Sequence, residues 1–356
     1  MLIVGFVAFY VLGKSAGNAG TAPASATNST ANPTPGSSTP ANSPAPSADS
    51  KPGSSLLRTD STLVSARSSF KTRLKSGPRD SSPVDVPPSG TFKLDQYDAP
   101  VGRLFAYVTP DPGDGKKHPA IIWITGGDCN SIGEVWLPAP SENDQTAAQY
   151  RQAGMVMMYP SLRGGNNNPG QKEGFLGEVD DVLAAAEYLL SKPYVDPENL
   201  YLGGHSTGGT LVLLVAASTN RFKAVFSFGP ADQVVGYGAD SGYLPYDFRN
   251  REEHVIRSPI VWVENIQSPV YVFEGGRGNA SAVTNLQGKS ISLKNRNLSF
   301  HLIQGTDHFR ILQPANQYLA QAIQRSADTR MPLEVSADEL KRAVLGNQPV
   351  SVPGRS

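Results

Sequence analysis

Hydrophobic residues in the centre of the chain form short continuous runs, separated by segments with helical spacing. In residues 177–193, for example, apolar side chains recur on one face of a helix until Pro193 ends it. Strands are predicted at 103–110, 118–125, 155–162, 199–206, 222–229, 269–276 and 298–305, and helices at 142–154, 177–193, 208–218 and 311–326. Apolar strands that alternate with helices are typical of an α/β fold with a mostly parallel central sheet and helices on both faces.

The same pattern predicts one folded domain over residues 91–328. The segments around it are an apolar N-terminus, a linker, a lead-in and a C-terminal tail, at residues 1–13, 14–55, 56–90 and 329–356. The linker is rich in Ser, Thr, Pro and Ala and contains no aromatic residue, Leu, Ile or Val, so we expect it to be disordered. In the tail, Ser336 and Glu339 have the spacing of a capping box and predict a short helix.

Residues 2–12 are apolar and uncharged and indicate a membrane tether or an export signal. Such a segment spans only about 16 Å as a helix, against about 30 Å of bilayer hydrocarbon, and no basic residue precedes it. A remnant of a longer leader and a buried helix remain alternatives. We expect the catalytic domain to lie outside the cytoplasm, anchored to a membrane or exported.

Charge and cysteine content exclude several classes of partner. Lys and Arg number 31, and Asp and Glu also number 31, which argues against nucleic acid as the main partner. Cys129 is the only cysteine, so no disulfide forms within the chain. The five histidines are scattered, and no residue cluster predicts a metal site or a bound cofactor.

The segment GHSTG, residues 204–208, matches the pattern G-x-S-x-G. This pattern is weakly specific by itself, but here a buried strand precedes it and an apolar helix follows. That context is the strand–turn–helix of a nucleophile elbow, in which glycines let the helix pass close to the strand and the serine hydroxyl projects above the sheet. The sequence therefore predicts Ser206 as a nucleophile, with a Gly-rich connecting loop as the alternative.

A serine hydroxyl needs a base and an oxyanion site. His308 follows the last predicted strand and is the candidate base, whereas His205 is expected to pack locally inside the elbow. The amide of Thr207 and an amide of Gly127 or Asp128, at the end of another strand, are the candidate oxyanion donors.

The chain resembles the catalytic domain of the prolyl oligopeptidase branch of the α/β-hydrolases over residues 91–328. The matching segments include HPAIIWITGGD, MYPSLRGGNNNPG, GEVDDVLAAAEYLLSKPYVDPENLYLGGHSTGG, RSPIVWVENIQSPVYVFEGG and GTDHFRIL, in the order of that family. The resemblance implies an α/β-hydrolase fold with Ser206 as the nucleophile and His308 as the base.

Three features depart from the family pattern. An Asp is expected at position 278, where this chain has Gly, so the third member of the triad is open. Asp232, after the preceding strand, ranks first for this role, followed by Asn279 and Glu274. Thr125 stands where many of these peptidases have an oxyanion tyrosine, and the segment before the domain is too short for a β-propeller, which makes small esters plausible substrates beside peptides.

These observations favour a serine hydrolase that cleaves ester or peptide bonds through an acyl-enzyme on Ser206. Its expected partner is a small ester or peptide substrate. A catalytically weak domain that binds a ligand or protein partner is the main alternative because of the missing Asp, and an acyltransferase that uses the same serine is another.

Overall fold

The computed structural model describes residues 61–75, 77–238 and 243–346. The elements described all belong to the unit Ser55–Ser356. The predicted apolar segment at residues 2–12 and the predicted linker lie outside the described residues. In the part of the chain that is described, no helix combines the length and the apolar character needed to cross a membrane.

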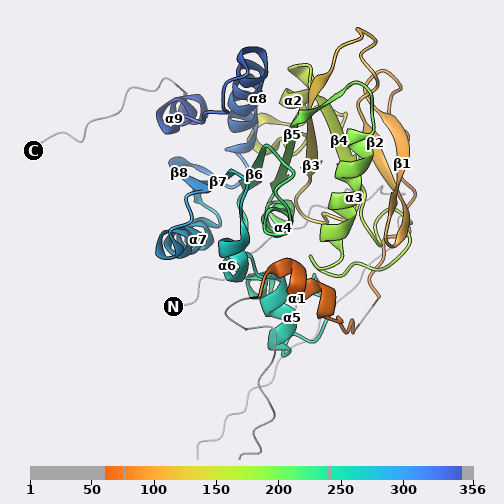
Figure 1. Ribbon diagram of the computed structural model, residues 1–356, viewed down its shortest axis with the longest axis vertical. Helices are drawn as coiled ribbons and strands as arrows, with labels where there is room; N and C mark the ends of the chain where they lie inside the picture. Colours follow the sequence, from red (N-terminus) through yellow and green to blue (C-terminus); the bar gives the residue numbers. More distant parts are fainter. Residues whose placement is uncertain (1–60, 76, 239–242, 347–356) are drawn as a thin grey trace, which may run out of the picture. The chain divides into compact units, whose positions relative to one another are not determined.

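An eight-stranded sheet forms the centre of the domain, with strand order β1-β2-β4-β3-β5-β6-β7-β8 (Figure 1). The strands are β1 (Lys93–Ala99), β2 (Gly102–Val108), β3 (His118–Ile124), β4 (Val156–Pro160), β5 (Val195–His205), β6 (Ala224–Phe228), β7 (Val270–Arg277) and β8 (Leu298–Asp307). Strand β2 pairs antiparallel with both β1 and β4, and every other pairing is parallel. The predicted mostly parallel sheet is confirmed.

Helices cover both faces of this sheet (Figure 1). Strand β3 shows the reason, because Ile122 and Ile124 face one hydrophobic cluster while Ile121 and Trp123 face the other. The first cluster includes side chains of α3 (Glu178–Leu190), α4 (Thr207–Ala216) and α7 (Ala280–Leu293). The second includes side chains of α2 (Ala148–Gln152), α8 (Leu312–Thr329) and α9 (Ala337–Leu345).

The remaining helices are short. They are α1 (Leu63–Ser69), α5 (Arg251–Arg257) and α6 (Pro259–Trp262), with 3-10 turns η2 (Ser141–Asn143), η3 (Val234–Tyr237) and η4 (Val263–Asn265). Helices α1 and α5 lie in contact (Figure 1). Leu63 and Ala66 of α1 enter the first hydrophobic cluster, so part of the predicted lead-in packs on the α/β domain.

Two differences from the predicted elements have local causes. The helix expected at 142–154 is reduced to α2, because Asp144 Oδ1 accepts the Thr146 N–H in a turn and Ala147 adopts a left-handed φ of 44°. Helix α7 was not predicted, since its sequence buries little beyond Val283 and Leu286 and shows weak periodicity. The short helix α9 is present, and Ser336 accepts the Glu339 N–H at its start as the capping box predicts.

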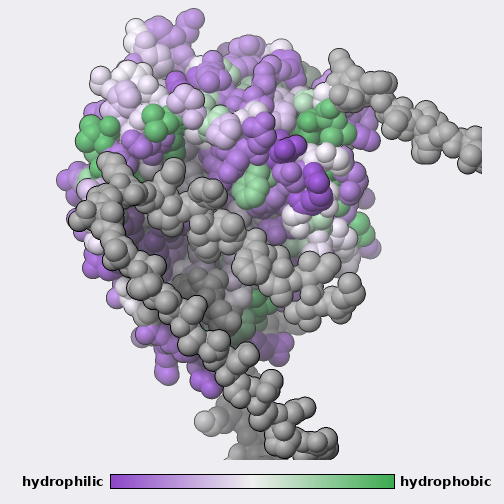
Figure 2. All heavy atoms as spheres, turned by 180° about the vertical axis from the view of Figure 1, so that it is seen from behind, coloured by the Kyte–Doolittle hydropathy of each residue, from purple (hydrophilic) through white to green (hydrophobic). Residues whose placement is uncertain are grey.

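Some large apolar side chains are exposed at the surface. Among the described residues they are Val64, Val86, Leu137, Val235, Ile291, Leu302, Phe309 and Met331. Most of the residues coloured in Figure 2 are polar, and the apolar ones form separate groups. Scattered exposed apolar residues of this kind are normal for a globular protein, but Phe309 is of interest because it follows His308.

Candidate active site

Ser206 occupies a sharp turn between β5 and α4. Its backbone has φ 55° and ψ −112°, a strained conformation for a residue other than glycine. A Cβ at Gly204 would lie 2.7 Å from the backbone of Gly208, and one at Gly208 would lie 2.3 Å from the Ile124 carbonyl oxygen. Only glycine fits at these two positions, so the sequence G-x-S-x-G forms here the strand–turn–helix that a nucleophile elbow requires.

The register of the parallel strands aligns three positions at the carboxyl edge of the sheet. His205 pairs with Phe228, and Phe228 pairs with Phe273. Ser206 follows His205, Gly229 follows Phe228, and Glu274 follows Phe273. These three residues therefore form a row along the carboxyl edge of the sheet. The Ser206 N–H donates to the Phe228 carbonyl oxygen at 2.7 Å, which ties the elbow to the neighbouring strand.

His308 directly follows the end of β8, and its side chain contacts Glu274 in this row. Its backbone N–H donates to the Arg277 carbonyl oxygen at 2.9 Å, and its Nδ1 lies 2.9 Å from Glu274 Oε2. Glu274 is fully buried and also accepts the N–H groups of Gly275 at 2.7 Å and of Asn279 at 3.1 Å. A carboxylate only accepts, so His308 carries its proton on Nδ1 and leaves the Nε2 lone pair available as a base.

Two glycines make room for this pair. A Cβ at position 229 would lie 2.3 Å from His308 Cε1 and 2.8 Å from Glu274 Oε2. A Cβ at position 278 would lie 2.9 Å from both Glu274 Oε1 and His308 Cβ. Both glycines also have positive φ, 57° for Gly229 and 151° for Gly278. The space next to Gly278, where the family pattern has an Asp side chain, is thus occupied by the carboxylate of Glu274.

Asp232, ranked first as the triad acid, has its hydrogen bonds to residues other than His308. Asp232 Oδ2 accepts from Asn285 Nδ2 at 2.9 Å and its Oδ1 accepts the Gln233 N–H at 2.9 Å, so the side chain is directed to α7 and not to His308. Asn279 has a supporting contact, because its Nδ2 donates to the Gly229 carbonyl oxygen at 2.8 Å. Glu274, ranked after Asp232, is the carboxylate that contacts His308.

One hydrogen bond joins the start of α4 to the loop after β3 that carries the other predicted oxyanion residues. Thr207 Oγ1 donates to the Gly127 carbonyl oxygen at 2.9 Å, which holds the loop after β3 against the elbow. The Thr207 N–H opens a helix, and N–H groups in the first turn of a helix have no acceptor within it. Gly127 has φ 73°, a conformation suited to glycine. Asp128 pairs through Oδ2 with Lys172 Nζ at 2.6 Å.

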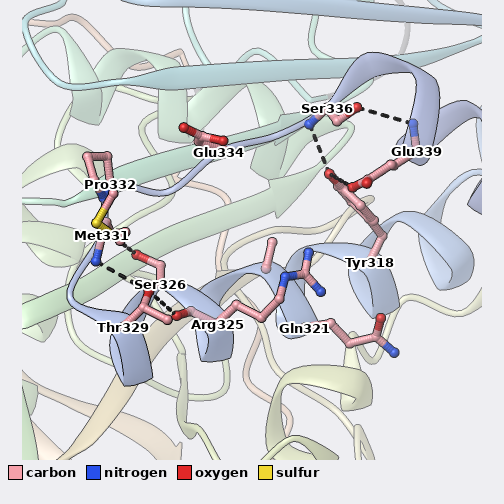
Figure 3. Close-up of a pocket in the computed structure, with 11 residues that line it drawn as sticks. Tyr318, Gln321, Arg325, Ser326, Thr329, Met331, Pro332, Glu334, Ser336 and Glu339 are labelled. Carbon is pink, nitrogen blue, oxygen red and sulfur yellow. Dashed lines mark hydrogen bonds between the residues drawn. The ribbon is translucent and has the colours of Figure 1, made fainter.

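One hollow of the described surface lies away from these residues. It has a volume of about 630 Å³ and lies between α8 and the segment 331–339 (Figure 3). Tyr318, Arg325 and Glu339 are among its lining residues, and none of the candidate catalytic residues borders it. Within the described residues, no group of three or more His, Cys, Asp or Glu side chains could hold a metal ion.

Residues 142–277 match the family model described as the prolyl oligopeptidase family. Two similar proteins of Bacillus subtilis (strain 168) are the uncharacterized peptidases YuxL, 27% identical over 198 residues, and YtmA, 26% identical over 182 residues. The YuxL match covers 50% of this chain and 28% of that protein, and the YtmA match covers 46% and 65%. The chain therefore spans less than two thirds of these relatives.

Solved structures agree with the α/β-hydrolase fold. An acylaminoacyl peptidase of Pyrococcus horikoshii superposes with a TM-score of 0.55 at 15% identity, over 70% of this chain and 44% of that one. A puromycin-hydrolyzing peptidase of Mycobacterium tuberculosis gives a TM-score of 0.51 at 20% identity, over 74% and 41%. At these identities the likeness concerns the fold, and the predicted fold class is confirmed.

Proposed function

Because the chain contains an α/β-hydrolase catalytic domain of the prolyl oligopeptidase family, a family of serine peptidases, we propose that it cleaves acyl bonds through an acyl-enzyme on Ser206. The observation that carries this proposal is the contact of His308 Nδ1 with Glu274 Oε2 in the strand row that contains Ser206. A hydroxyl becomes a nucleophile when an oriented imidazole takes its proton.

In the proposed acylation step, Ser206 Oγ attacks the carbonyl carbon of the substrate while its proton moves to His308 Nε2. The imidazolium that forms donates from Nδ1 to Glu274, whose negative charge stabilises it. The oxyanion accepts the Thr207 N–H and an N–H of the loop at Gly127 or Asp128. Collapse of the tetrahedral intermediate breaks the bond to the leaving group, which takes the proton from Nε2.

Deacylation repeats the chemistry with water. His308 Nε2 takes a proton from the water as it attacks the acyl carbon, and returns that proton to Ser206 Oγ when the acid is released. A buried and fully hydrogen-bonded Glu274 keeps the imidazole in one tautomer through both half-reactions. A carboxylate at this place lies in the space of the Asp expected at position 278, which supports a hydrolase over a binding domain.

We take peptides as the first substrate class and small esters as the second. The two relatives from Bacillus subtilis are named peptidases, which favours an amide bond. An acyl-enzyme serine also cleaves esters, whose leaving groups depart more easily, so esters are the more sensitive assay substrates.

A fluorophosphonate probe tests the nucleophile directly. The wild-type chain should be labelled and the variant Ser206→Ala should not be. Ser218→Ala is the matched control, because Ser218 follows the other end of α4 and its hydroxyl donates to the Leu214 carbonyl oxygen. A panel of p-nitrophenyl esters and peptide p-nitroanilides then identifies the acyl group. Absence of labelling and of turnover in the wild type would overturn the proposal and favour a binding domain.

A further inference from the structure

His205 connects the elbow to the loop of the catalytic histidine. It precedes Ser206 in the chain and is 1% exposed. Its Nε2 lies 3.1 Å from the backbone carbonyl oxygen of His308, and the two imidazole rings lie 4.5 Å apart between centroids. The expectation that His205 packs locally therefore misses a contact that spans 103 residues of sequence.

The same imidazole contacts the region of the oxyanion loop. Nδ1 of His205 lies 3.2 Å from Oε1 of Gln145, in the segment before α2. A Cβ at Gly126, the first residue of the Gly pair after β3, would lie 2.8 Å from Nδ1. The buried His205 ring, next to Ser206 in the chain, thus contacts both the backbone of His308 and the loop that carries the proposed oxyanion donors.

The chemistry of these contacts assigns the proton of His205. Burial, and then repulsion by His308 when that ring is protonated, lower the pKa of His205 well below its ordinary value, so the ring is neutral. A neutral imidazole has one N–H, and the His308 carbonyl can only accept, so Nε2 carries the proton. Gln145 Oε1, which faces Nδ1, also accepts the Gly126 N–H at 3.3 Å. Rotation of the Gln145 carboxamide gives up that contact and turns its NH2 group toward the unprotonated Nδ1, so that one acceptor and one donor face the two ring nitrogens.

We infer that His205 is a positioning residue for the proposed hydrolysis: its Nε2–H holds the backbone of His308 so that the catalytic imidazole meets Ser206. This inference rests on the proposed function. A displacement of about 1 Å between reacting groups can cost on the order of 100-fold in rate. Loss of the Nε2–H should therefore lower kcat and leave KM nearly unchanged.

The test compares two amide substitutions in the full-length chain. His205→Gln places a side-chain N–H where Nε2 lies and should keep kcat within about 3-fold of wild type, whereas His205→Asn places it near Nδ1 and should lower kcat at least about 10-fold. KM for the same p-nitrophenyl ester should stay within about 2-fold in both. The rate of fluorophosphonate labelling should fall in parallel with kcat. Both variants bury an amide of similar polarity, so a difference between them reports the position of the N–H.

His301 provides the matched control. It is a partly buried histidine on β8 that stacks on Phe273 with centroids 5.2 Å apart, and its Nε2 has no hydrogen-bond partner within the described residues. His301→Gln and His301→Asn should both retain wild-type kcat. Thermal unfolding of all four variants separates lost folding from lost positioning.

Each outcome decides between the two proposals. An active wild type with equal kcat in His205→Gln and His205→Asn overturns the role of His205 and leaves the proposed function intact. A wild type that is neither labelled nor active overturns both. If His205→Asn does not fold, the His308 Nδ1 proton resonance of His205→Gln decides: a wild-type chemical shift supports the inference, and a shifted or absent signal contradicts it.

Discussion

Glu274 and His308 are 34 residues apart in sequence, yet Oε2 of the glutamate lies 2.9 Å from Nδ1 of the histidine. Glu274 continues β7 directly after the apolar run VYVF, and His308 leaves the end of β8. Parallel pairing of the two strands brings them to the same edge of the sheet. The pair therefore depends on strand register and not on any local motif.

We predict that Glu274→Gln lowers kcat by about 10³- to 10⁴-fold, because an amide neither selects the Nδ1–H tautomer nor stabilises the imidazolium. Steady-state kinetics with an activated ester measure this loss. Asp232→Asn serves as the control, since Asp232 contacts Asn285, and it should keep wild-type turnover. A large loss of kcat in Asp232→Asn together with a small loss in Glu274→Gln would instead support Asp232 as the triad acid.

Gly229→Ala should inactivate the site because the added methyl group clashes with the imidazole of His308. The added methyl group would lie 2.3 Å from His308 Cε1, in a residue with φ 57°. We expect kcat to fall at least about 100-fold through displacement of the imidazole. Gly154→Ala controls for backbone strain, because Gly154 has φ 82° and nothing lies within 4 Å of an added Cβ. It should lower the melting temperature and preserve kcat, and an equal loss of kcat in both variants would contradict the steric argument.

Phe309 should affect the leaving group of the substrate. Its ring is 40% exposed and packs edge-on against His308, with centroids 4.9 Å apart. In the proposed mechanism the leaving group takes its proton from His308, so an aromatic leaving group would pass beside this ring. An aromatic contact is worth about 1 kcal/mol, which corresponds to a factor of about 5.

The measurement uses two esters with one acyl group, an aryl and an ethyl ester. Phe309→Ala should lower kcat/KM for the aryl ester about 5-fold relative to the ethyl ester. Phe309→Leu, which keeps apolar area without an aromatic face, should give a smaller difference. An equal decrease for both esters would show that Phe309 supports His308 and does not contact the leaving group.

The fold could be predicted from the sequence because the buried strands are continuous apolar runs and the helices between them are periodic. β3 and β5 show this, since nearly every residue from Ala120 to Ile124 and from Leu200 to His205 is buried. The sharp turn at Ser206 could be predicted because its steric demands are local and require glycines at fixed positions.

The carboxylate that contacts His308 could not be predicted in the same way. Its identity depends on which residue of β7 follows the partner of Phe228 and on the space left by Gly229 and Gly278, and both are properties of the assembled sheet. One local signal was present: Glu274 follows four apolar residues of a buried strand, where an isolated carboxylate is costly unless it has a partner. The sequence contains no comparable signal for the proposed role of His205. Its partner is the backbone carbonyl of His308, and every residue has such a carbonyl.

The stability of the domain should fall as the pH drops below about 6.5, in part because of His205. Burial and the neighbouring His308 lower the pKa of His205 in the folded state well below that of the unfolded chain. Below the unfolded value the unfolded chain therefore binds one proton more at this site, and the free energy of unfolding decreases as the pH falls, by up to about 1.4 kcal/mol per pH unit. The loss continues until the pH reaches the lowered pKa of the folded state.

Urea unfolding at pH 7.0, 6.0 and 5.0 measures this slope. In His205→Gln, which has no titratable group at this position, the decrease between pH 6.5 and 5.0 should be smaller by up to about 2 kcal/mol. Above pH 7 the two proteins should have parallel pH dependence, because His205 is neutral in both the folded and unfolded states there. Identical slopes below pH 6.5 would mean that His205 takes up its proton at the same pH in the folded and unfolded chains, which would contradict the lowered pKa of the buried ring.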